Sequence, residues 1–172
     1  MRKQNRRPQP RTNYSLMSEV MASPSEPMPE FWRTTQLASM WVGLDRLKVG
    51  VEAAPDDWRC CSDAVNLMET FTVNGPWLDC GGDRVTIEDA QGLLQDAVTA
   101  LALAGKRHMA GRKLELLPEE WPAVTAVLED YAELIAVLPQ RQMIRCHRLT
   151  EKRIHELLAG RGQKHDVEIV TA

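Results

Sequence analysis

No stretch of this 172-residue sequence approaches the roughly 20 consecutive apolar residues that a membrane-spanning helix requires. Its four cysteines have no regular spacing, since Cys60 and Cys61 are adjacent while Cys80 and Cys146 stand apart, so we expect no disulfide framework. The motifs G-x-G-x-x-G, P-loop, G-x-S-x-G and H-E-x-x-H do not occur. These absences argue against a membrane protein, a disulfide-rich secreted protein and the common enzyme classes. We therefore expect a cytoplasmic protein without a cofactor.

Charge is segregated along the chain, although the net charge is only −3. Residues 1–11 contain five basic residues and no acidic one, residues 12–140 contain nine basic and twenty acidic residues, and residues 141–172 contain seven basic and four. No apolar segment follows the basic start, so we do not expect a secretory signal. The acidic centre should repel nucleic acid, whereas either basic end could attract a polyanion.

Hydrophobic periodicity predicts an all-α fold, because apolar residues recur at three- and four-residue steps. The third helix contains "AVTALALAG", which is apolar almost all round, so we expect it to be the buried central helix. A short strand pairing of "KLEL" with the tail "HDVEIVTA" is an open alternative. We predict a compact bundle of about five helices, at about 34–50, 55–73, 86–105 (or to 111), 118–138 (or from 122) and 140–158.

The first 30 residues differ from the rest in composition, being rich in Pro, Ser, Arg and Gln. Their five prolines disfavour a stable helix, although "YSLMSEVMA" could form a short helical turn against the body. The predicted organisation is a basic, Pro-rich, disordered arm over 1–30, a helical bundle over 31–160 and a C-terminal tail over 161–172.

Zinc binding is the first chemistry to consider. The sequence lacks a C-x₂₋₄-C pair, His147 and His155 are eight residues apart, and adjacent cysteines on a helix point in different directions. We interpret Cys61 as a core residue and predict no metal site. The side chains considered as ligands are Cys60, Cys61, Cys80, Cys146, His147, His155 and His165.

Acid–base catalysis has less support. A cluster of carboxylates falls on the fourth predicted helix, but such runs are usually solvated faces, and catalysis would require a pocket that shifts one pKa. We therefore predict no catalytic residue. The carboxylates concerned are Glu119, Glu120, Glu129, Asp130 and Glu133.

Two basic features are candidate binding elements. The fifth predicted helix carries four cations at steps of four, three and four residues, which places them on one face where each could meet a phosphate. The alternatives are a solvated face or a face docked on the acidic body. Trp32 and Trp77 are possible interface anchors, because tryptophan is enriched at binding hot spots. The predicted contacts for nucleic acid or an acidic partner are Arg2, Lys3, Arg6, Arg7 and Arg11 in the arm, with Arg141, Arg145, Arg148 and Lys152 on the helix.

A set of segments gives the chain a recognisable layout: "MRK…RRP", the methionines around 17–21, "DDWRCCSDAVNLMETF", an Ala/Leu-rich helix and "PEEWPAVTAVLEDYAELI". This layout resembles small helical proteins encoded in phages and prophages of β- and γ-proteobacteria. The resemblance implies a phage context and the cytoplasm of a bacterial host, and it transfers no active-site residue.

Three functional hypotheses follow. The first is a non-enzymatic phage-encoded binding protein, a regulator or inhibitor that docks on a host protein or nucleoprotein complex through the arm and the basic helix face. The second is a protein that binds DNA or RNA without sequence preference, because no base-reading motif accompanies the basic residues. An enzyme is the least favoured, for want of any motif.

Overall fold

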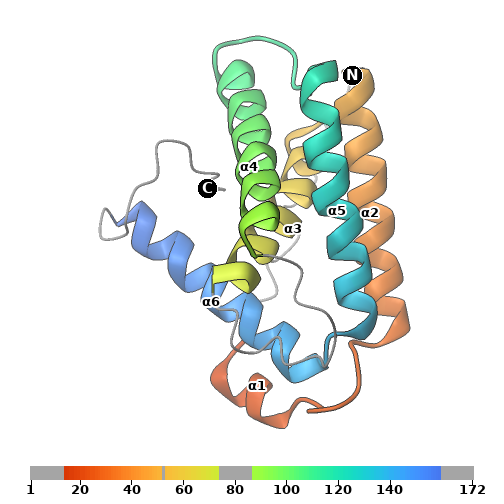
Figure 1. Ribbon diagram of the computed structural model, residues 1–172, viewed down its shortest axis with the longest axis vertical. Coiled ribbons are helices and arrows are strands. Elements are labelled where there is room, and N and C mark those ends of the chain that lie inside the picture. The colour runs from red at the N-terminus through yellow and green to blue at the C-terminus, as the bar shows by residue number, and fades with distance from the viewer. Residues whose placement is uncertain (1–13, 52, 74–86, 160–172) are drawn as a thin grey trace, which may run out of the picture.

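The computed structural model describes residues 14–51, 53–73 and 87–159 of the chain (Figure 1). These residues form helices and no strand, which confirms the predicted all-α bundle. The proposed strand pairing involves residues 165–172, which lie outside the described residues. The elements are α1 (Leu16–Met21), α2 (Glu30–Val49), α3 (Pro55–Val73), α4 (Ile87–Met109), the 3₁₀ helix η2 (Pro118–Glu120), α5 (Trp121–Val137) and α6 (Gln140–Leu158).

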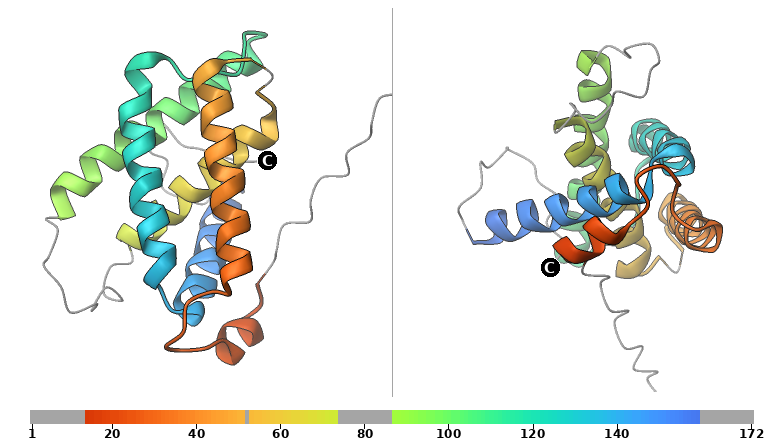
Figure 2. Two further views of the ribbon diagram at one scale, coloured as in Figure 1. Left: turned by 90° about the vertical axis from the view of Figure 1, so that its right-hand side faces the viewer. Right: turned by 90° about the horizontal axis from the view of Figure 1, so that it is seen from below.

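The helices pack in crossed layers. Helices α2 and α5 run side by side along the long axis, while α3 and α4 cross behind them and α6 lies across one end (Figures 1 and 2). Helix α1 lies against α6 at that same end. None of the described helices combines the length and the apolar character needed to span a bilayer.

The central helix is α3, which contacts α2, α4, α5 and α6. This corrects the expectation that the Ala/Leu-rich third helix, now α4, would be central. The apolar pattern of the sequence did not identify α3 as the central helix, because the buried face of α3 includes polar residues that form hydrogen bonds within the fold. The hydroxyls of Thr70 and Thr150 lie 2.8 Å apart, and Nη2 of Arg153 donates to the backbone oxygen of Asn66 at 3.3 Å.

The sequence rules for helix ends hold at most boundaries. Helix α2 begins at Glu30, four residues before the expected start, and ends at Val49, where it is capped by Gly50 in a left-handed conformation with φ of 64°. The two candidate starts of the fourth predicted helix are both used, because η2 begins at Pro118 and Pro122 sits in the first turn of α5. Proline is tolerated at both places because the first-turn N–H groups have no helical acceptor.

The segment from residue 14 to residue 29 is packed on the body, which moves the boundary of the predicted arm. Ala22 and Met28 are buried, and the backbone N–H of Gln140 donates to the carbonyl of Glu26 at 2.7 Å. The backbone N–H of Arg141 likewise donates to the carbonyl of Ser23 at 3.0 Å. The prolines of this stretch prevent a long helix but not docking, because carbonyl groups still accept hydrogen bonds. The short helical turn considered for "YSLMSEVMA" is α1.

Candidate binding surfaces

Helix α1 turns its apolar side chains toward solvent. Ser15 caps the helix by accepting a hydrogen bond from the N–H of Ser18 at 3.0 Å. Four apolar side chains of α1 are well exposed, and we call them the α1 apolar face: Leu16 (61%), Met17 (67%), Val20 (58%) and Met21 (78%). Phe31 in the first turn of α2, at the same end of the bundle, is 84% exposed. This is the reverse of the usual arrangement, in which an amphipathic helix buries its apolar side.

Two arginines of α6 hold α1 in this orientation. Arg148 forms an ion pair with Glu19, which is the acidic residue of α1. Nη2 of Arg141 donates to the backbone oxygens of Val20 and Ala22, both at 3.2 Å. Because the polar side of α1 is bound to α6, its apolar side is left facing outward.

The basic stripe predicted on the fifth helix is therefore only partly available to a partner. Arg141 and Arg148 contact the chain itself, which is the alternative of a face docked on the protein's own body. Lys152 lies 3.7 Å from Glu156 in an exposed pair, and Arg145 is also exposed. Binding of phosphate by this stripe stays a prediction. The arm residues Arg2, Lys3, Arg6, Arg7 and Arg11 lie outside the described residues, as does Trp77.

The other possible anchor, Trp32, is half-buried in an aromatic cluster at the base of the N-terminal segment. Its ring lies edge-on to His147 with centroids 6.0 Å apart, and the ring of Tyr14 lies 5.3 Å from the same imidazole. Nε2 of His147 is inaccessible to solvent and finds no hydrogen-bond partner among the described residues. Burial lowers the pKa of His147 to about 4, so the imidazole is neutral at pH 7. The cluster joins residues around 14 and 32 to α6 through apolar packing.

A second surface lies at the C-terminal end of α4, where residues 106–113 form what we call the basic turn. The helix ends in a Schellman motif: Gly111 has φ of 81°, its N–H donates to the carbonyl of His108 at 2.9 Å, and the N–H of Arg112 donates to the carbonyl of Arg107 at 3.0 Å. Arg107 is used internally, since it pairs with Glu120 at 2.7 Å and donates to the carbonyl of Glu115. The exposed basic side chains of the turn are Lys106, His108, Arg112 and Lys113.

Our sequence reasoning missed this surface, although the sequence carries a signal for it. The run "GKRHMAGRK" holds five basic residues and no acidic one within the otherwise acidic centre of the chain. Summing charge over residues 12–140 concealed it. Phe31 was missed for another reason, because the predicted helix began only at about residue 34, whereas α2 begins at Glu30.

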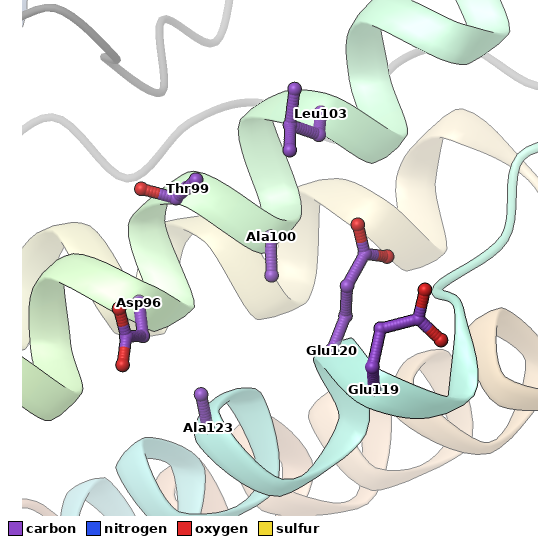
Figure 3. Close-up of a pocket in the computed structure, with 7 residues that line it drawn as sticks. All are labelled: Asp96, Thr99, Ala100, Leu103, Glu119, Glu120 and Ala123. Atoms are coloured by element: carbon purple, nitrogen blue, oxygen red, sulfur yellow. The ribbon is translucent and has the colours of Figure 1, made fainter.

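A shallow hollow of about 240 Å³ lies between α4 and the η2–α5 segment (Figure 3). Its lining includes three carboxylates, but Glu120 is already engaged by Arg107 and by the N–H of Leu117 at 2.7 Å. The hollow therefore offers an acidic wall rather than an assembled catalytic group. Its lining residues are Asp96, Thr99, Ala100, Leu103, Glu119, Glu120 and Ala123.

The remaining carboxylates of the predicted cluster lie exposed on α5, as expected for a solvated face. Partial burial, followed by repulsion from Glu133 and Glu129, raises the pKa of Asp130. This shift comes first from partial burial and then from like charges on the same helix surface, and it does not require a catalytic pocket.

The candidate metal ligands do not converge in the part of the chain that the structure describes. Cys61 and Cys146 are buried, and burial raises the pKa of Cys146 to about 12 and that of Cys61 further, so both thiols are protonated at neutral pH. His147 lies in the aromatic cluster and His155 is exposed, while Cys80 and His165 fall outside the described ranges. Across these ranges, no group of three His, Cys, Asp or Glu side chains is placed to hold a metal ion.

Comparisons with protein-family models, with curated proteins and with solved structures found no match to this chain. The resemblance to phage- and prophage-encoded proteins therefore stays a prediction from the sequence. Two surfaces of the described residues are exposed and available to a partner, the α1 apolar face and the basic turn.

Proposed function

We propose that this protein is a non-enzymatic binding protein that docks through its N-terminal segment, the basic arm followed by α1. The observation that supports the proposal is the outward orientation of the α1 apolar face. On the phage resemblance, the partner is a host protein, alone or within a nucleoprotein complex, and the protein acts as its regulator or inhibitor.

The α1 apolar face exposes enough apolar area to water to contribute substantially to binding. Fully burying one aliphatic side chain of this size contributes about 1.5–3 kcal/mol. Four side chains that are 58–78% exposed could therefore contribute roughly 4–8 kcal/mol to binding, before the costs of association are subtracted. That is enough for a specific contact if the partner offers a groove that accepts a short helix.

Charge indicates the chemistry of the partner. Five cations and no acidic residue precede α1, and the first acidic residue, Glu19, is neutralised by Arg148. The docking segment therefore combines an apolar face with a positive arm. The complementary surface is an apolar groove with an acidic rim, because such a rim steers the arm and the groove buries the helix face.

The orientation of α1 makes the segment ready to bind. Arg141 and Arg148 fix the helix on α6 with its apolar side outward, so a partner meets a helix that is already formed. Preorganisation of this kind reduces the ordering cost, which a six-residue helix could not otherwise overcome in water.

The test is site-specific photo-crosslinking. A photoreactive residue replaces Met17 on the α1 apolar face or, as the control, Val42, an exposed apolar residue midway along α2. Both proteins are exposed to nuclease-treated bacterial lysate. We expect a discrete protein adduct from position 17 and none from position 42.

Two further variants establish specificity. Changing Leu16 and Val20 to serine should abolish the adduct without lowering the melting temperature, because both side chains are exposed. Changing the five arm cations to glutamine should reduce the yield of the adduct, and the reduction should be largest at low salt, where charges are least screened. An adduct that forms equally from both positions, or that survives both sets of substitutions, would contradict the proposal.

A further inference from the structure

The basic turn is a second, separate surface at the opposite end of the bundle from α1 (Figure 1). We infer that it binds the phosphate backbone of a nucleic acid without sequence preference. This inference does not rest on the proposed docking of α1, because the two surfaces share no residue.

The first reason is that the cations of the turn other than Arg107 form no ion pair within the described part of the fold. Of the five basic residues in 106–113, only Arg107 has an acidic partner in the described part of the chain, Glu120. Lys106, Arg112 and Lys113 are exposed and form no ion pair with any described residue.

The second reason is that the turn has a defined shape. The Schellman hydrogen bonds close it, and the N–H of Leu116 donates to the carbonyl of Leu47 at 2.9 Å, which fixes the following segment to the end of α2. Charges held on a fixed backbone lose less conformational entropy when they bind than charges on an unstructured segment. Lys48, in the last turn of α2, adds a further cation next to this attachment point.

A simpler account is that the cations complement the negative C-terminal end of α4. That end carries the equivalent of about half an elementary charge, and the favourable effect is confined to the last turn. Lys106, Arg107 and His108 already lie in that last turn. Arg112 and Lys113 come after the helix has ended, so the dipole does not account for them.

The nearby acidic residues do not cancel the surplus. Glu120 is paired with Arg107, Glu115 is half-buried, and Glu119 is exposed within η2. Nothing in the turn resembles a groove-reading helix or an aromatic platform. The ligand class is therefore the sugar–phosphate backbone, which DNA and RNA share.

The experiment measures the salt dependence of binding by the full-length protein. The probes are a fluorescent 24-base-pair DNA duplex and a 24-nucleotide oligo(U), each titrated between about 50 and 200 mM salt. The test variant changes Lys106, Arg112 and Lys113 to glutamine. Each phosphate contact contributes about 0.9 to the slope of log affinity against log salt for duplex DNA and about 0.7 for a single strand. Loss of three contacts should therefore make the slope shallower by about 2.7 for the duplex and about 2.1 for the single strand.

The matched control lowers the net charge by the same three units elsewhere on the surface, by changing the exposed residues Gln36, Ser39 and Gln95 to glutamate. It should leave the slope near that of the parent, because it removes no phosphate contact. The arm is intact in all three proteins, so its contribution cancels in the comparison.

Each outcome decides the inference. A shallower slope for the test variant alone supports it, and the probe that the parent protein binds more tightly at the same salt concentration identifies the preferred nucleic acid. Equal slopes for the test and control variants with both probes overturn it, as does a parent that binds neither probe. The single change Lys113→Gln, with an expected slope change of about 0.9 on duplex DNA, gives the same decision if the triple variant folds poorly.

Discussion

A single methyl group added at Gly43 should loosen the bundle, although helix propensity alone predicts the opposite. Gly43 lies in the middle of α2, where the helix passes close to the start of α3. A Cβ atom at this position would lie 2.7 Å from the carbonyl oxygen of Asp57 and 3.2 Å from its Cα. These are backbone atoms, so no side-chain rotation can relieve the contact.

Two opposing terms set the magnitude. Replacing glycine by alanine in a helix contributes about 1 kcal/mol of stability. The new contact is roughly 0.6 Å shorter than an ordinary carbon–oxygen contact of about 3.3 Å, and overpacking of a close-packed interface costs about 1–3 kcal/mol. The upper end applies here, because separating α2 from α3 also strains the ion pair between Arg46 and Asp57 at 3.1 Å. The net expectation for Gly43→Ala is a loss of about 2 kcal/mol, or a melting temperature lower by about 4–8 °C.

The assay is thermal unfolding followed by circular dichroism, and Gly92→Ala provides the control. Gly92 is also helical, in α4, but a Cβ there meets no atom within 4 Å. That variant should therefore gain the propensity term alone, with a melting temperature higher by about 2–4 °C. If Gly43→Ala melts at or above the temperature of the parent, α2 and α3 do not approach each other as closely at Gly43 as the structure places them.

Three further predictions test the core, the buried histidine and the attachment of α1. Leu101→Ala, at a fully buried position of α4, should lower the free energy of unfolding by about 2–5 kcal/mol in urea titrations, and a loss below 1 kcal/mol would contradict its place in the core. The free energy of unfolding should fall by about 3 kcal/mol between pH 6.5 and pH 4, because His147 is protonated near its ordinary pKa of 6.5 in the unfolded chain but stays neutral down to about pH 4 in the folded protein. The variant His147→Phe should lose this part of the pH dependence. Identical profiles of stability against pH for the parent and the variant would refute the prediction. A double-mutant cycle of Arg148→Gln and Glu19→Gln should give a coupling of about 0.5–1 kcal/mol with faster amide exchange confined to α1, whereas zero coupling would show that this pair does not hold the helix.

The sequence by itself determined the helices and most of their ends, because these depend on interactions between residues a few positions apart. Apolar spacing located five of the six α-helices among the described residues. Gly50 marked the end of α2, Pro118 and Pro122 marked the starts of η2 and α5, and Pro139 marked the end of α5. The basic turn belongs to the same class, since its five basic residues lie within eight positions and its Schellman motif is closed by Gly111. It was predictable, and was missed only because charge was counted over too long a stretch.

The tertiary structure alone decided which helix is central and which surfaces are left for a partner. Helix α3 can bury Asn66 and Thr70 because α6 supplies Arg153 and Thr150 some 80 residues later in the chain. Helix α1 displays its apolar side because Glu19 meets Arg148, 129 residues away. Residues at such separations are brought together only by the packing of the whole bundle, so no local pattern indicates whether an arginine faces a phosphate, the solvent or a carboxylate of its own chain.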